Sequence, residues 1–549
     1  MLNLAVGNPP HPPATSGRHC FMEARFSLMY TSTRLPTRRG LLAGAAASLL
    51  AVTSVQSVAA QAAEPSASPS PAAVSVDFGS REGQLPRPER LNNFGNVTAW
   101  PEQRAGDAKF LNKQGLHGDV YRIWLSSPNA ADSLDVFNLC DLKTQRCDLS
   151  KLDAYLTEAS TVSDSVMINL NPTDFVEGKR PMKDLEPMLE LIVRSVKTKY
   201  PRVKYVEAFN EPDWQFYGQQ RRQGIPPDKT TLQPGDLYRF YEPYYEAVNK
   251  VNKGLRRADR IELGGPALSW LDPKWMKPFL DDYAADENPH KRLDFLAYHA
   301  YLTWGDDTYK KPTMYKGDLR VVASQRETLL GWLKERRIHQ RIPSYVTETG
   351  IYPGPAYDDT DPKKDYVRQA AGMATYAYYF ANQPDSYMFN WCVRHRVEER
   401  KDQLVTRTPN GPVNDTFTPY GNAMLMQSRM KNTRVSAGVS GALEGDNGVY
   451  AMASKDRSGA SLMVWNWQHV GDRSYRATID MSRMPSELRN RPVRQLMYRI
   501  DQNTSNYFSD PAKAGLQLVD KKIVRPGRTH TATVDLAPNA IYLIVLERA

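Results

Sequence analysis

Eight short apolar runs that alternate with segments of helical spacing constrain the fold of this chain more than any other feature of its sequence. In the helical segments, such as residues 184–200 and 237–256, apolar side chains recur every three or four positions. Strands that alternate with helices indicate βα units and a parallel sheet. Eight such units predict an α/β fold, a closed (β/α)8 or TIM barrel, whose functional residues lie at the carboxyl ends of the strands. The predicted strands are residues 91–95, 119–125, 166–170, 205–210, 261–265, 293–301, 344–348 and 387–393.

The pattern of the sequence changes after residue 430. Short alternating runs replace the helical spacing, as in residues 462–467 and 540–547, and such runs are typical of antiparallel strands. We therefore predict a (β/α)8 barrel over residues 88–430 and a C-terminal antiparallel β-sandwich domain over residues 431–549. Residues 64–87 are predicted to be a linker and N-terminal segment, because residues 64–75 are rich in proline and serine.

Residues 1–63 have the pattern of a twin-arginine signal peptide. Arg38 and Arg39 precede an apolar stretch rich in alanine and glycine, and small residues that suit peptidase cleavage follow at 60–63. A retained membrane anchor is the alternative, but no charged stop-transfer flank follows the stretch. We therefore expect export by the twin-arginine route to the periplasm or the cell exterior, with no stable membrane insertion after cleavage.

The charge of the chain gives little support to a nucleic-acid partner. Of the formal net charge of +10, five arginines and one glutamate in residues 1–63 account for +4, which leaves +6 for the rest. No run of basic residues is interleaved with aromatic residues, so a solvated basic surface is the simpler interpretation. An acidic polysaccharide stays open as a partner, and the sequence indicates no oligomeric state.

The four cysteines suggest one disulfide and no metal site. Cys140 and Cys147 bracket the short loop "CDLKTQRC", which an oxidising compartment could close. Cys20 falls in the signal region, and Cys392 follows an apolar strand and is expected to be a buried thiol. No cluster of cysteine and histidine has the spacing of metal ligands.

Two of the predicted strands end on a glutamate. "FNEP" places Asn210 and Glu211 at the end of the fourth strand, and "TETG" places Glu348 at the end of the seventh. Because the carboxyl ends of barrel strands meet at one face, these side chains can approach each other. Paired carboxylates are what glycosidic hydrolysis requires, whereas ion-paired structural carboxylates are the alternative. Glu207, inside the fourth strand, could point into the barrel and support these residues, but it is not among the predicted site residues.

These motifs resemble those of the clan A retaining glycoside hydrolases and, more narrowly, of glycoside hydrolase family 39. "NFG" near the first strand, "YRIWL" in the second and "YHAY" in the sixth add to the resemblance, which spans residues 88–549. It implies that Glu211 is the general acid/base and Glu348 the nucleophile. Thr349 departs from the family pattern, in which an aromatic residue commonly follows the nucleophile.

The resemblance also implies a set of substrate-binding residues. Asn210 would bind the 2-hydroxyl of the sugar, and Arg122 would keep Glu348 ionised. The remaining implied residues are His299 and Tyr301, which would orient the nucleophile and the sugar, and Trp391, which would lie under the sugar ring. From the sequence itself, Trp214 is a candidate for a leaving-group subsite. A structural ion pair for Arg122, a core histidine and plain packing of Trp391 are the alternatives.

The sequence therefore predicts an exported retaining glycoside hydrolase that cleaves a poly- or oligosaccharide by double displacement, without metal or organic cofactor. A transglycosylase is the alternative within the same chemistry. A non-catalytic carbohydrate-binding protein on the same barrel is the alternative from another class. The sugar, the linkage and exo or endo action are not predicted.

Overall fold

The structure is a computed structural model, and it describes most of the chain beyond the predicted signal region. The described residues are 68–96, 106–126, 134–302, 318–339, 341–351, 361–394, 402–407, 415–441, 443–469 and 471–549. The predicted signal peptide, residues 1–63, lies outside them. Within these ranges no helix combines the length and the apolar character needed to cross a bilayer.

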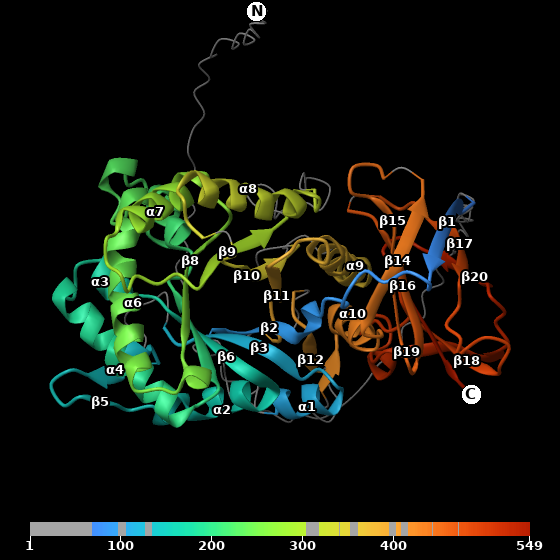
Figure 1. Ribbon diagram of the computed structural model, residues 1–549, viewed down its shortest axis with the longest axis horizontal. Helices are drawn as coiled ribbons and strands as arrows, with labels where there is room; N and C mark the ends of the chain where they lie inside the picture. The colour runs from blue at the N-terminus through green and yellow to red at the C-terminus, as the bar shows by residue number, and fades with distance from the viewer. Residues whose placement is uncertain are drawn as a thin grey trace, which may run out of the picture. The chain divides into compact units, whose positions relative to one another are not determined.

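Eight parallel strands close into a barrel, as the sequence predicted (Figure 1). Each strand pairs in parallel with its neighbours in chain order, and β11 closes the barrel on β2 through Asn390 opposite Asn92. The barrel strands are β2 (Leu91–Asn96), β3 (Gly118–Trp124), β6 (Ser163–Leu170), β7 (Val203–Ala208), β8 (Glu262–Leu268), β9 (Phe295–Tyr301), β10 (Ser344–Gly350) and β11 (Ser386–Asn390). Each overlaps one of the eight apolar runs, which confirms the fold class.

The helices between the strands cover the barrel with their apolar faces. In α4 (Leu185–Lys199), the residues at helical spacing, including Leu189, Ile192 and Val196, are buried. This face packs inward because burying each large aliphatic side chain stabilises the fold by about 1.5 to 3 kcal/mol. The other described α-helices are α1 (Asp107–Lys113), α2 (Asp153–Val162), α3 (Thr173–Val176), α5 (Gln219–Arg222), α6 (Leu237–Lys253), α7 (Pro273–Ala285), α8 (Val321–Glu335), α9 (Pro362–Phe380) and α10 (Pro419–Ser428).

The C-terminal region forms a nine-stranded sheet in the order β19-β18-β21-β16-β15-β14-β1-β17-β20. All neighbours are antiparallel except β1 and β17. Residues from both halves of the sheet, such as Leu462 and Ile479, share one apolar core, so the curled sheet packs on itself as a sandwich does. Its strands are β1 (Ser70–Asp77), β14 (Thr433–Ser440), β15 (Gly448–Asp456), β16 (Gly459–Trp467), β17 (Tyr475–Ser482), β18 (Val493–Ile500), β19 (Gln517–Val524), β20 (His530–Leu536) and β21 (Ile541–Arg548).

Residues 70–77, which the composition assigned to a linker, are strand β1 of this sheet. The linker interpretation is wrong for them, because the proline and serine content obscured an alternation in which Ala72, Val74 and Val76 are buried and the residues between them are exposed. β1 pairs with β14 on one side and with β17 on the other (Figure 1). The β-domain is thus built from both ends of the chain.

Removing β1 is expected to unfold the β-domain. Val74, Val76 and Phe78 are each 1% exposed, and their burial contributes about 5 to 9 kcal/mol, which is comparable with the stability of a whole domain. A chain that begins at residue 79 should therefore unfold at a much lower urea concentration, or fail to fold, whereas a chain that begins at residue 68 should match the longer protein. Equal unfolding midpoints for the two chains would contradict this role of β1.

The barrel and the β-domain meet at α9. The indole nitrogen of Trp465 on β16 donates a hydrogen bond to the Thr375 hydroxyl on α9 at 2.8 Å. Trp465 is fully buried and stacks on Tyr450 with ring centroids 5.7 Å apart. Trp467, which is also buried, lies against the Cβ position of Gly372 on the same helix. These tryptophans hold the two parts of the chain together.

Candidate active site

The chain turns sharply at the carboxyl end of β7 and places Glu211 over the next strand. Phe209 and Glu211 have φ angles of 67° and 48°. This left-handed backbone conformation costs a residue other than glycine about 1 to 3 kcal/mol. The backbone N–H of Glu211 donates to the Ala267 carbonyl of β8 at 2.8 Å, which fixes this turn. Glu348 lies near the carboxyl end of β10 and is 4% exposed.

Glu211, Glu348 and His299 converge at this face of the barrel. Each offers one polar atom, and these three atoms lie within 4.8 Å of one another. His299 Nδ1 is 2.8 Å from Glu211 Oε1 and 3.6 Å from Glu348 Oε2. The Tyr301 hydroxyl donates to Glu348 Oε2 at 2.7 Å. The structure thus brings together two carboxyl groups that the sequence places on different strands.

Arg122 on β3 connects Glu348 of this cluster with polar side chains of neighbouring strands. The guanidinium is fully buried and donates to Glu348 Oε1 at 2.8 Å and to Glu207 Oε2 at 2.6 Å. It also donates to the side-chain oxygens of Asn210 at 2.8 Å and Asn93 at 3.0 Å. A buried cation with two carboxylate partners and further hydrogen bonds is strongly held in place.

Glu207, Asn93 and Asn169 complete this network, and none of them is among the site residues predicted from the sequence. Glu207 Oε2 accepts a second hydrogen bond, from Asn169 at 2.8 Å, and Asn93 donates to the Thr347 carbonyl at 2.7 Å. A signal for Glu207 was present, because a charge inside a buried strand needs a partner. The only signal for the asparagines is their polar character on strands of a buried sheet.

The two glutamates and the histidine of this cluster could present atoms to a metal ion. Glu211, His299 and Glu348 are the three-residue set of potential ligands found among the described residues. Both oxygens of Glu348 already accept hydrogen bonds, from Arg122 and Tyr301. A carboxylate held by a guanidinium and a hydroxyl is suited to nucleophilic attack or proton transfer, so the bonding at this cluster favours acid–base chemistry.

The environments of the two glutamates differ. Burial raises the pKa of Glu211 to about 7, with Arg122 opposing the shift. Burial also raises the pKa of Glu348, while His299, Arg122 and the hydrogen bond from Tyr301 oppose it. Burial lowers the pKa of His299 to about 4, so this ring is neutral near pH 7. At that pH, Arg122 and Tyr301 are the groups that oppose the upward shift of the Glu348 pKa. Arg122 lowers the pKa of Glu348, as expected from the sequence. The effect of burial is larger, so the pKa of Glu348 lies above its ordinary value.

Two tryptophans predicted to bind substrate lie at different places around the cluster. Trp391 follows β11, is 7% exposed, and has its ring centroid 5.6 Å from that of Trp124 on β3. The Trp124 ring in turn lies 5.5 Å from the guanidinium carbon of Arg122. Trp214 lies on η7 (Asp213–Gly218), a π-helix that begins two residues after Glu211.

Asp213, which the sequence did not single out, joins η7 to the end of β8. It accepts hydrogen bonds from the backbone N–H of Ser269 at 2.9 Å and from the Ser269 hydroxyl at 2.6 Å. Burial raises the pKa of Asp213 to about 7. The segment that carries Glu211 is therefore fixed at both ends, through Ala267 before η7 and through Ser269 within it.

Cys140 and Cys147 form a disulfide across the hairpin of β4 (Cys140–Asp141) and β5 (Arg146–Cys147). Cys392 is buried and lies outside this disulfide. The hairpin contacts α4 on the outside of the barrel. This disulfide therefore takes no part in the cluster of Glu211, His299 and Glu348.

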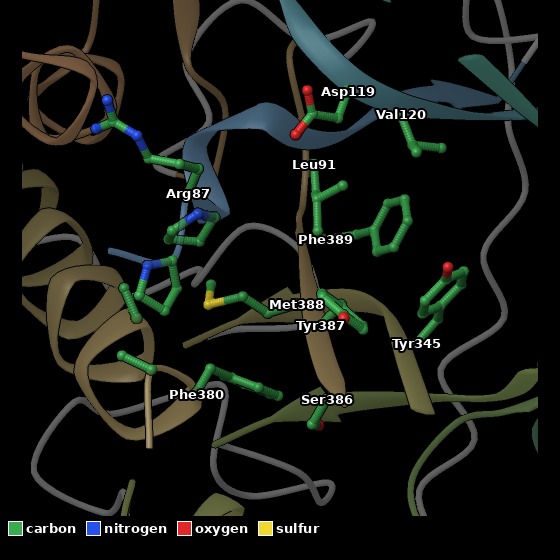
Figure 2. Close-up of a pocket in the computed structure, with 14 residues that line it drawn as sticks. Arg87, Leu91, Asp119, Val120, Tyr345, Phe380, Ser386, Tyr387, Met388 and Phe389 are labelled. Atoms are coloured by element: carbon green, nitrogen blue, oxygen red, sulfur yellow. The ribbon is translucent and has the colours of Figure 1, made fainter. Parts of the chain in front are cut away.

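An apolar pocket of about 330 Å³ lies at the other end of the barrel (Figure 2). Its lining includes Leu91, Val120 and Tyr345, which are at or near the amino-terminal ends of β2, β3 and β10. Asp119, at the same end of β3, pairs with Arg90 at 2.7 Å. In barrels of this kind the amino-terminal face serves stability rather than chemistry, so the acidic cluster is the candidate active site.

Comparisons with known proteins identify the fold. No family model matches the sequence, and a search of curated proteins found no match. A solved bacterial orthologue of human α-L-iduronidase is 12% identical, with a TM-score of 0.64 over 87% of this chain and 84% of its own. A GH39 enzyme from Xanthomonas axonopodis pv. citri is 14% identical, with a TM-score of 0.62 over 87% and 98%. A monomeric β-xylosidase from Caulobacter crescentus CB15 is 14% identical, with a TM-score of 0.62 over 87% and 99%. This chain therefore has the fold of these solved enzymes.

Proposed function

We propose that the protein is a retaining glycoside hydrolase that cleaves a poly- or oligosaccharide by double displacement. The observation that carries this proposal is the approach of Glu211 and Glu348, whose facing atoms lie within 4.8 Å. Retaining glycosidases hold their two carboxyl groups about 5 to 5.5 Å apart, whereas inverting enzymes need about 6.5 to 9.5 Å to admit water. The iduronidase, GH39 and xylosidase structures that share the fold add support.

In the first step, the Glu348 carboxylate attacks the anomeric carbon while Glu211 gives its proton to the glycosidic oxygen. The bond to the leaving group breaks, and a covalent ester forms between Glu348 and the sugar. Glu211 is able to carry this proton at neutral pH because burial raises its pKa to about 7. In the second step, Glu211 takes a proton from water, the water oxygen attacks the anomeric carbon, and the ester bond breaks.

The neighbouring residues position these two groups and the sugar. The side-chain oxygen of Asn210 accepts from Arg122, so its amide nitrogen is left to donate to the 2-hydroxyl of the sugar. Tyr301 orients the Glu348 carboxylate through Oε2. His299, neutral near pH 7, holds Oε1 of Glu211.

A transglycosylase is the second candidate, because η7, which begins two residues after Glu211, carries the aromatic residues Trp214 and Tyr217. The Trp214 ring lies 4.3 Å from the guanidinium carbon of Arg222, and the Tyr217 hydroxyl accepts from Lys274 at 2.7 Å. Such rings can hold an acceptor sugar, which would then intercept the ester in place of water. The ratio of transfer product to free sugar at increasing acceptor concentration distinguishes the two activities.

Glu211→Ala is expected to lower kcat/KM about 10²- to 10⁴-fold for substrates with poor leaving groups and much less for substrates with good ones, because only poor leaving groups need a proton in the first step. Wild-type kcat/KM should fall as pH rises through about 7, where Glu211 loses its proton, and this fall should be absent in the variant. Steady-state kinetics with a series of aryl glycosides across pH measures both effects. Equal losses for all leaving groups would show that Glu211 is not the acid.

We also propose that the protein is exported by the twin-arginine route. The Arg38–Arg39 pair before an apolar stretch supports this. The Cys140–Cys147 disulfide adds support, because such bonds persist in oxidising compartments. Cell fractionation that finds the mature chain only in the cytoplasm would refute the proposal.

A further inference from the structure

The β-domain contains a strongly basic hollow that the proposed mechanism does not use. The hollow has a volume of about 740 Å³, and four turns or connections contribute to it: those after β1, between β15 and β16, between β17 and β18, and between β19 and β20. Two carboxylates, Asp456 and Glu487, also line it. Its six cationic side chains are Arg81, Lys455, Arg457, Arg483, Arg489 and Arg528. The lining therefore has an excess of four positive charges.

The two carboxylates of the lining are engaged within their own turns. Asp456 Oδ1 accepts from the backbone N–H and the hydroxyl of Ser458 at 2.7 and 2.6 Å. Glu487 Oε2 accepts from the Ser486 hydroxyl at 3.1 Å. Neither carboxylate is placed to neutralise the arginines by a close ion pair.

Most of the arginines are left to face a ligand. Arg483 pairs with Asp77, Nε to Oδ1 at 2.5 Å. For the other four, no carboxylate oxygen of the described residues lies within 4 Å of the guanidinium. Nε of Arg489 is buried and has no hydrogen-bond partner. An unpaired buried donor at the wall of a hollow is costly unless a ligand or water accepts from it.

The arginines project from a fixed framework. The N–H of Met484 donates to the Arg528 carbonyl at 3.1 Å, and the N–H of Asn490 donates to the Pro526 carbonyl at 2.7 Å. These bonds join the β17–β18 connection to the β19–β20 connection. The Ser80 hydroxyl accepts from the N–H of Ser436 at 2.7 Å, which joins the turn after β1 to β14. Binding of a ligand would therefore require little free energy to order the backbone around the hollow.

We propose that this hollow binds an anionic polysaccharide through its carboxylate or sulfate groups. A guanidinium donates two parallel hydrogen bonds to an oxyanion of either kind, which explains the preference for arginine over lysine here. The volume of the hollow is in the range that accommodates small molecules or a few sugar units. Nucleic acid is disfavoured because the aromatic residue of the lining, Phe78, is 1% exposed and offers no ring for base stacking. The choice of a polysaccharide among polyanions rests on the proposed function.

Titration calorimetry of the purified protein with polygalacturonate, dextran sulfate and neutral dextran tests the proposal. Polygalacturonate carries carboxylates and dextran sulfate carries sulfates. The polyanion that binds more tightly therefore identifies the anionic group that the hollow prefers. We expect at least one polyanion to bind about tenfold or more tightly than dextran, and to weaken as added salt screens the charges. The variant Arg81→Gln/Arg457→Gln/Arg528→Gln should lose about tenfold or more of this affinity. All three side chains are exposed, so the fold should tolerate the changes.

The matched control removes three charges elsewhere. Lys143, Arg146 and Lys151 are exposed residues of the barrel domain, and their joint replacement by glutamine should leave the affinity unchanged. Equal binding of dextran and both polyanions, or an equal loss in the control, would overturn the proposal. Because the measurement is of binding, it judges the hollow even if aryl glycosides prove not to be cleaved, and that separate failure would refute only the proposed catalysis.

Discussion

Replacing Glu348 with alanine is expected to lower kcat/KM for aryl glycosides by about 10⁵-fold or more, because it removes the carboxylate that forms the glycosyl ester. Arg122 and Tyr301 hold this carboxylate by both oxygens, which fixes the position of the nucleophile. The space left by alanine should admit azide, which attacks the anomeric carbon directly. Added azide should therefore restore part of the turnover and release a glycosyl azide of inverted configuration.

Two companion variants make this result specific. Glu348→Gln keeps the shape of the side chain without its charge and leaves no space for azide, so it should be inactive with and without azide. Glu211→Ala should keep most of its kcat/KM on substrates with good leaving groups, since the nucleophile is intact, whereas its kcat should fall because Glu211 also takes the proton from water in the second step. Equal residual activity in Glu348→Ala and Glu211→Ala would show that the two roles are wrongly assigned.

Replacing Arg122 with methionine is expected to lower the free energy of unfolding by about 3 to 5 kcal/mol, because Glu207 and Glu348 would remain buried without a cation. Arg122 also opposes the upward shift of the Glu348 pKa, and its loss should raise this pKa further. Ionised Glu348 would then require a higher pH, so the acid limb of kcat/KM should move upward. Urea unfolding measures the first effect and a pH–rate profile the second.

The double variant Arg122→Met/Glu207→Met separates stability from catalysis. Removing the second buried charge should recover part of the lost stability, because Glu207 pairs with Arg122 at 2.6 Å and is fully buried. The pH–rate profile should stay shifted, since Glu348 still lacks its cation. A loss of stability below about 1 kcal/mol in the single variant would contradict the buried network.

The sequence predicts the barrel well because each of its strands is a local signal. An apolar run of strand length, followed by helical spacing, is visible without knowledge of the partner strand, and the position of Glu211 and Glu348 at strand ends follows from it. β1 could not be predicted in this way. Its partners β14 and β17 lie far along the chain, and its own residues resemble a linker in composition.

The details of the site depend on contacts that no local pattern encodes. Arg122 is visible as a charge in a predicted strand, but its four partners lie on or just after three other strands, β2, β7 and β10, and are brought together only by closure of the barrel. The direction of the Glu348 pKa depends on the balance between burial and these partners. The basic hollow was equally hidden, because its arginines come from separate turns and form no basic run.

The position of β1 has a consequence for the order in which the protein is made. Ala73 on β1 bonds to Ser440 on β14, 367 residues later. At about 5 to 20 residues per second, the ribosome needs about 20 to 70 seconds to synthesise the intervening chain. During that interval the apolar side chains of β1 have no sheet to join, whereas the barrel can complete itself. The β-domain therefore closes only after β14 to β21 have been made and can meet β1.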